Sequence, residues 1–373
     1  MRLPYLLITI IFLCGCRYKN DKTNTPQQHD TVPVKTDTIT PRYAEAKADS
    51  IVIAAVGDIM LGTSYPNNST LPPDGAKHAF DAVKDELIAA DLAFGNLEGV
   101  LLDSGAAAPY KLKLRTKPYL FRMPEKYGEV LKDAGFDVLS VANNHISDFG
   151  VAGRKSTMKV LDSAKIKYAG LLTAPTAVFE LNGIKYGFCA FSPNSNVVPF
   201  LDLKNAANII KELRQQADIV IVSFHGGSEG TQHEHVPFKK ESFSSENRGD
   251  VHAFAHNAID AGADLVLGHG PHVTRAVELY NGRFIAYSMG NFCTYRGVSV
   301  SGVCGISPLF KIHINKKGEF LSGKIIPTKQ THHRGLERDT LNKVIKRIKF
   351  LTQTDFPQSG LNITDDGLIT PAD

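Results

Sequence analysis

The chain has 373 residues, of which 43% are hydrophobic and 21% are charged, and its formal net charge is +4. This length accommodates one large domain, or one domain with appendages. So small a positive charge, without a zinc-finger or RNA-binding signature, argues against a nucleic-acid partner.

Residues 1–16 are predicted to be a lipoprotein signal peptide. Arg2 supplies a positive end, and the apolar run over residues 3–13 is too short to span a bilayer as a mature helix. The run leads into Leu13-Cys14-Gly15-Cys16, which resembles a bacterial lipobox. We therefore expect a lipid on Cys16 and an extracytoplasmic protein anchored to a membrane of the cell envelope. An ordinary secretory signal and an uncleaved anchor are the alternatives.

Residues 17–49 are predicted to form a flexible tether. They are polar and rich in Thr, Asp, Lys and Pro, so they cannot bury enough apolar surface to offset the entropy lost on folding. The main domain is expected over residues 50–330. Residues 331–373 are expected to form a C-terminal helix over Asp339–Leu351 and a tail that is disordered beyond Pro357.

Five short apolar runs punctuate the main domain and are separated by segments with helical spacing. Continuous runs of this kind, rich in β-branched residues, are typical of strands buried on both faces, so the pattern predicts an α/β fold. In open α/β sheets, ligands bind beyond the carboxyl ends of the strands. The runs are residues 51–56, 91–95, 138–142, 218–224 and 263–267.

Each of these runs ends in side chains that can bind a metal ion or a substrate. Any one of them also has a purely structural explanation: Asp58 can cap a helix, and residues 143–148 can form a turn whose side chains bond their own backbone. Their recurrence at five strand ends instead predicts one metal-dependent hydrolase site. The side chains are Asp58; Asn96 and Glu98; Asn144, His145 and Asp148; His225 and Glu229; and His269 and His272.

Three further patterns have two interpretations each. Lys111–Lys117 alternates cations with apolar residues, which is typical of a solvated edge strand or of a track for an anionic polymer. His252 and His256 have the i,i+4 spacing of metal ligands on a helix, although surface histidines have the same spacing. Cys293 and Cys304 can form a disulfide or can be packing residues.

Six segments resemble the capsule-synthesis CapA family, which is associated with poly-γ-glutamate and is itself similar to the calcineurin-like metallophosphoesterases. They are GDIMLG, GNLEG, ANNHISDFG, SFHGGSE, AGADLVLGHGPHV and YSMGNF, in this order across residues 51–326. The resemblance implies a four-layer α/β/β/α sandwich, with two packed β-sheets between helices and a site built from the strand-end loops.

The resemblance also implies roles for individual residues. His145, oriented by Asp148, is the expected general acid, and Arg122 is expected to hold the negative charge of the substrate. Met60 stands where related phosphoesterases have a histidine ligand. One or two divalent ions (zinc, manganese or iron) are expected on Asp58, Glu98, Asn144, His225, His269 and His272, and substrate contacts are expected from Asn96, Glu229 and Asn291.

The reaction implied by this resemblance is hydrolysis of a phosphoester, or cleavage or transfer of an amide in an anionic γ-glutamyl polymer. The partner is then an anionic polymer or a small anionic substrate. The alternative is a non-enzymatic accessory protein that holds or threads an anionic capsule polymer at the cell surface.

Overall fold

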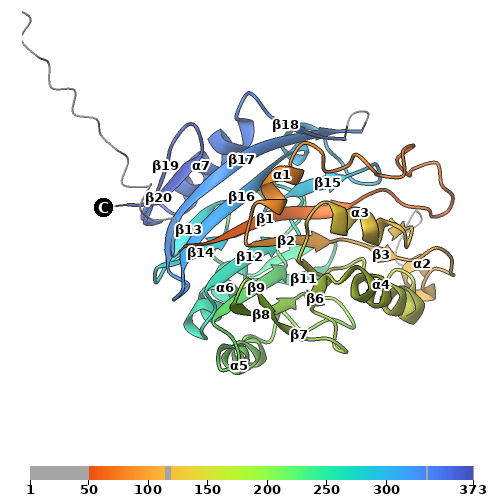
Figure 1. Ribbon diagram of the computed structural model, residues 1–373, viewed down its shortest axis with the longest axis horizontal. Helices are drawn as coiled ribbons and strands as arrows, with labels where there is room; N and C mark the ends of the chain where they lie inside the picture. Colours follow the sequence, from red (N-terminus) through yellow and green to blue (C-terminus); the bar gives the residue numbers. More distant parts are fainter. Residues whose placement is uncertain (1–49, 114–118, 333–334, 373) are drawn as a thin grey trace, which may run out of the picture. The chain divides into compact units, whose positions relative to one another are not determined.

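The computed structural model describes residues 50–113, 119–332 and 335–372 (Figure 1). The predicted signal peptide, the lipidation site Cys16 and the tether lie outside the described residues. Among the helices that are described, none has the length and apolar content needed to cross a membrane.

The first of two large sheets is built around β1, which pairs with the parallel strands β2 and β15 and with the long antiparallel strand β16. Along the sheet the strands follow the order β19-β20-β17-β16-β1-β2-β5-β6, with β15 also on β1 and β18 on β17. The bounds are β1 Ser50–Met60, β2 Leu92–Leu97, β5 Val138–Ser140, β6 Lys167–Ala169, β15 Asn291–Thr294, β16 Ile306–Asn315, β17 Phe320–Thr331, β18 Gly335–Arg338, β19 Leu361–Ile363 and β20 Leu368–Pro371.

The second large sheet has a parallel centre, β8, β9, β12 and β14, with an antiparallel strand at each edge. Its order is β13-β14-β12-β9-β8-β7. The bounds are β7 Thr176–Leu181, β8 Ile184–Phe191, β9 Ile219–His225, β12 Leu265–His269, β13 Val277–Tyr280 and β14 Arg283–Ala286. Two small sheets pair β3 Val100–Leu101 with β4 Arg122–Met123, and β10 Glu241–Phe243 with β11 Glu246–Gly249.

Helices pack on both large sheets. The helices α1, α3 and α4 lie with the first sheet, and α5 and α6 pack on β8, β9 and β12 of the second (Figure 1). The helices are α1 Lys84–Ile88, α2 Pro109–Lys113, α3 Tyr127–Asp133, α4 Gly150–Ala164, α5 Leu203–Arg214, α6 Val251–Asp260 and α7 Lys343–Asp355, with a 3-10 turn, η3, over Gly302–Gly305.

The residue alternation along β9 shows how the two sheets face each other. Side chains of a strand point alternately to its two faces. Ile219 and Ile221 belong to the hydrophobic core that they share with β1 of the first sheet. Val220 and Val222 belong to a second core, with Ile210 of α5 and other helical residues. One face of the second sheet therefore packs on the first sheet, and the other packs on helices.

The predicted α/β class is confirmed, and several local predictions are wrong. The segment Pro109–Lys113 is the helix α2 and not part of an extended strand, while residues 114–118 lie outside the described part. The chain beyond Pro357 is ordered, because β19 and β20 extend the first sheet and Ile369 is buried there. For Cys293 and Cys304 the packing interpretation is confirmed and the disulfide alternative is not, because both carry free, buried thiols.

Candidate functional site

Asp58 lies at the carboxyl end of β1, between polar residues of both neighbouring strands. The parallel register places it opposite Asn96 of β2 and Asn291 of β15. Gly57 is needed at the preceding position, since a Cβ there would lie 2.0 Å from the carbonyl oxygen of Gly290. The chain thus holds a fully buried carboxylate at one fixed point in the sheet.

Three side chains hold the carboxylate of Asp58. Asn96 Nδ2 donates to Asp58 Oδ1 at 2.9 Å, and His269 Nδ1 lies 3.1 Å from the same oxygen. His272 Nδ1 lies 3.1 Å from Asp58 Oδ2. Burial opposes ionisation of Asp58, but the bonds and charges of His269 and His272 outweigh it and hold the pKa of Asp58 well below its usual range. Asp58 is therefore an anion in a buried setting.

Asp58, Glu98 and His272 form a compact group whose ligand atoms lie within 4.8 Å of one another. Glu98 Oε1 is 3.5 Å from His272 Nε2. Burial raises the pKa of Glu98 to about 8. Burial has the opposite effect on His272, but Glu98 and Asp58 outweigh it and raise the pKa of His272 to about 10. This group therefore retains at least one proton at neutral pH that a cation would have to displace.

His272 has an unusual backbone for a residue with a side chain, with φ at 58°. Such a left-handed conformation costs energy and is commonly kept where function needs it. Asn291 supports it, because Asn291 Nδ2 donates to the His272 carbonyl at 3.2 Å and Asn291 Oδ1 lies 3.1 Å from His272 Nδ1.

Several buried polar atoms beside this group have no hydrogen-bond partner among the described residues. They include both ring nitrogens of His225, Nε2 of His269 and the side-chain oxygen of Asn144. Burial and the nearby Arg248 guanidinium hold the pKa of His225 well below its usual range, so its ring is neutral. Buried polar atoms without partners are rare and need an explanation. Imidazole nitrogens, carboxylates and an amide oxygen are together a fitting donor set for a divalent cation.

His145 and Asp148 form a second pair at the same edge. His145 Nδ1 lies 2.7 Å from Asp148 Oδ2, and the Phe121 ring lies 4.0 Å from the His145 ring, centroid to centroid. The Phe121 backbone N–H also donates to Asp148 Oδ2 at 2.9 Å. Burial would raise the pKa of Asp148, but His145, Lys111 and the Phe121 N–H outweigh it and lower the pKa, so the carboxylate is ionised. His145 is therefore held in one orientation, with Nδ1 engaged and Nε2 available.

Lys111 joins this pair, which the sequence does not predict. Its Nζ lies 2.9 Å from Asp148 Oδ1 and also donates to the Asn144 carbonyl. The alternating pattern of residues 111–117 hides this contact, because α2 turns Lys111 inward while Lys113 is exposed. A signal that could have indicated the helix is Pro109, which is favoured in the first turn.

A cavity of about 370 Å³ opens over these residues. Because His145 and His272 line it, the cavity gives a substrate access to both side chains. Its lining includes Lys111, Phe121, Asn144, His145, Glu229 and His272.

Three residues expected to contact substrate are instead bonded to other groups of the protein. The Arg122 guanidinium donates to Ser64 and to the Gly105 carbonyl, and Arg122 does not line the cavity. Asn96 and Asn291 instead hold Asp58 and His272. Glu229 does line the cavity, and it lies 3.3 Å from Nη1 of the buried Arg248.

Residues 52–296 match the family described as Bacterial capsule synthesis protein PGA_cap. The chain belongs to this family. All the strand-end residues described above, from Asp58 to Asn291, fall within the matched range.

Curated relatives of this family member include two proteins of bacilli. The chain is 30% identical over 298 residues to the PGA biosynthesis protein CapA of Bacillus subtilis, a match that covers 75% of this chain and 72% of the relative. It is 28% identical over 286 residues to the capsule biosynthesis protein CapA of Bacillus anthracis, covering 70% of this chain and 64% of the relative.

Among solved structures, the chain is similar to a 5'-nucleotidase precursor from Thermus thermophilus, with 14% identity and a TM-score of 0.41. The match covers 82% of this chain and 59% of the other. A likeness of this degree says nothing about the reaction of the PGA_cap family member.

Proposed function

We propose that this chain is a metal-dependent hydrolase of capsule biosynthesis, acting on an anionic polymer of the poly-γ-glutamate type or on a small anionic substrate. The observation that carries the proposal is the set of unpartnered, buried ligand atoms on His225, His269 and Asn144 beside the compact group Asp58, Glu98 and His272. The family membership and the capsule-biosynthesis names of the bacillus relatives support the link to capsule polymer.

The group Asp58, Glu98 and His272 would hold one divalent cation, because its ligand atoms converge within 4.8 Å. Asn144, His225 and His269 supply the donors for completing that site or for a second ion. Met60 is fully buried and brings no nitrogen ligand to β1. A cation held there would supply Lewis-acid chemistry to the scissile group and would lower the pKa of a water molecule toward neutrality.

The protein's own residues supply the proton transfer. With Nδ1 of His145 engaged by Asp148, the ring presents Nε2 to the cavity and can donate a proton from it to the leaving group. Asp148 stays ionised and stabilises the charged ring before the proton leaves. Lys111 fixes the other oxygen of Asp148, so the carboxylate cannot turn away from His145.

The second proposal is a non-enzymatic accessory protein that binds capsule polymer in the same cavity. The observation that favours it is Met60 at a position where related phosphoesterases have a histidine ligand. The accessory protein should still bind polymer after the cation is removed, and this prediction distinguishes it from the hydrolase.

Metal analysis and turnover on one preparation separate the two. Purified protein is assayed for bound metal and for cleavage of poly-γ-glutamate and of a generic phosphodiester, alongside Asp58→Asn and His225→Ala. The hydrolase requires at least one ion per chain and turnover that both variants lose. The control is Asp137→Asn, which alters a carboxylate that bonds the Ala93 N–H near the opposite end of β2. Metal-free protein that binds polymer without cleaving it supports the accessory role and contradicts the hydrolase.

We further propose that the domain is anchored to the cell envelope by a lipid on Cys16 and works extracytoplasmically. The lipobox-like Leu13-Cys14-Gly15-Cys16 and the polar stretch after it support this. Metabolic labelling with a fatty-acid analogue tests it: the label should appear on the wild type and be absent from Cys16→Ala.

A further inference from the structure

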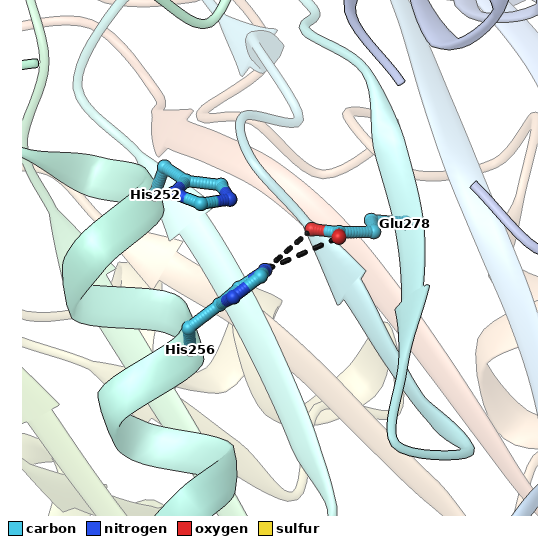
Figure 2. A group of neighbouring side chains, drawn as sticks. All are labelled: His252, His256 and Glu278. Atoms are coloured by element: carbon cyan, nitrogen blue, oxygen red, sulfur yellow. Dashed lines mark hydrogen bonds and ion pairs between the residues drawn. The ribbon is translucent and has the colours of Figure 1, made fainter. Parts of the chain in front are cut away.

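A second cluster of ligand-competent side chains joins α6 to the edge strand β13. His252 and His256 come from successive turns of α6, and Glu278 comes from β13 (Figure 2). One ligand atom from each lies within 4.8 Å of the other two. None of the three belongs to the group around Asp58, which comes from β1 and from the chain that follows β2 and β12.

We propose that His252, His256 and Glu278 bind a zinc-class divalent ion that links α6 to β13. Two imidazoles one helical turn apart with one carboxylate are a known ligand pattern for zinc, and a water molecule can complete four-coordination. In the sequence the two histidines have no Glu-rich context. The fold brings the carboxylate of Glu278 to His256 from 22 residues away.

The three side chains are already aimed at a common point. His256 Nε2 lies 3.1 and 3.0 Å from the two carboxylate oxygens of Glu278, and the His252 ring lies 4.0 Å from the His256 ring, centroid to centroid. Figure 2 shows both rings and the carboxylate turned toward the same space. Little side-chain reorganisation is therefore needed for an ion to bind.

Neighbouring aromatic residues hold these ligands in place. Tyr280 stacks on His256 with ring centroids 3.6 Å apart, and Phe238 contacts the His252 ring at 4.5 Å. The buried Tyr287 hydroxyl donates to Glu278 Oε2 at 2.6 Å. A hydrogen bond to a ligating carboxylate from outside the ligand set orients it and is typical of metal sites.

The electrostatics also suit a cation. Burial and the neighbouring His256 lower the pKa of His252, which leaves a neutral ring with a free lone pair. The side chains of His256 and Glu278 are 21% and 12% exposed, so an ion can enter from solvent and still be largely shielded. The alternative is an ordinary ion pair between His256 and Glu278 in which His252 takes no part.

Zinc titration of purified protein by calorimetry distinguishes the two. The wild type should bind one more zinc ion per chain than His256→Gln and than Glu278→Gln. Tyr287→Phe should keep the stoichiometry and weaken this site about tenfold, the lower end of the usual effect of losing such a supporting bond. The matched control is His235→Gln, because His235 pairs with Asp355 at 2.6 Å in the same manner but, within the described part of the chain, belongs to no such three-ligand group.

A second readout does not depend on counting ions. In an Asp58→Asn background, zinc should raise the unfolding temperature, and the additional substitution His256→Gln should reduce that rise. Equal zinc stoichiometry in wild type and His256→Gln would overturn the proposal. So would an equal zinc-induced rise of the unfolding temperature in Asp58→Asn and in Asp58→Asn/His256→Gln. Because the two proteins share the Asp58→Asn change and differ only at position 256, the difference between them reports on this site and not on the proposed hydrolase site.

Discussion

Asp58 and His269 are 211 residues apart in the chain, yet His269 Nδ1 lies 3.1 Å from Asp58 Oδ1. The contact joins the carboxyl ends of β1 in one sheet and β12 in the other. It exists because both strands run toward the same edge of the packed sheets, where His225 of β9 is paired in register with His269. The proposed cation site is thus a product of the fold rather than of any single loop.

Changes at the His145–Asp148 pair should lower turnover without removing the cation. His145→Ala removes the proposed proton donor, and Asp148→Asn removes the anion that orients it. Loss of a positioned general acid typically costs about 10²- to 10⁴-fold in rate. We expect kcat to decrease by a factor in this range while the metal content stays at the wild-type level. Unchanged kcat in His145→Ala would exclude this residue as the proton donor.

Replacing Lys111 should lower kcat through the same His145–Asp148 pair, whereas replacing Lys113 on the same helix should not. Lys111→Met removes the side-chain ammonium group, which lies 2.9 Å from Asp148 Oδ1. A bond between charged groups contributes about 1.5–3 kcal/mol, so we expect kcat to fall by about tenfold or more. Lys113→Met, an exposed position on the same helix, is the control. Equal effects of the two substitutions on the rate would point to general surface charge instead.

Metal binding at neutral pH should release protons. The pKa of Glu98 is raised to about 8 and that of His272 to about 10, so at pH 7 the metal-free pair holds at least one proton that the cation displaces. Apparent affinity should therefore rise as the pH increases from 7 toward 10, about tenfold per pH unit for each proton released. Calorimetry in two buffers of different ionisation enthalpy measures the number of protons released when the metal binds. Zero protons released at pH 7 would contradict the assignment of this pair as ligands.

The C-terminal strands should stabilise the domain. Ile369 of β20 is fully buried and belongs to the core shared by the two sheets. Ile369→Ala should lower the free energy of unfolding by about 2–5 kcal/mol, the usual range for such a truncation. Asn362→Ala, an exposed position on β19, should change it little. Urea denaturation measures both, and a negligible effect of Ile369→Ala would agree with a disordered tail and not with this structure.

Much of the fold and of the site could be predicted from sequence because two physical rules act together. Buried parallel strands show as continuous apolar runs, and the carboxyl ends of such strands meet at one edge. Asp58, His225 and His269 could therefore be expected to converge before any coordinates were known. The C-terminal segment could not, because β19 and β20 are short and gain their stability from the edge of β17 rather than from their own apolar pattern.

The roles of individual polar residues were harder to predict than their positions. Asn96 and Asn291 do lie at the site, but their amides hold Asp58 and His272. Arg122 is a strong ligand for anions in principle, and its guanidinium is occupied by Ser64 and Gly105. Which group a side chain bonds depends on contacts between segments distant in sequence, and no local pattern encodes them.

The most direct test of the central claim is anomalous X-ray diffraction from crystals of the protein grown with manganese or zinc. We expect a peak within about 2.0–2.2 Å of ligand atoms of Asp58, Glu98 and His272, the distance range of carboxylate and imidazole ligands. A well-ordered site in saturating metal without a peak among these three side chains would contradict the account.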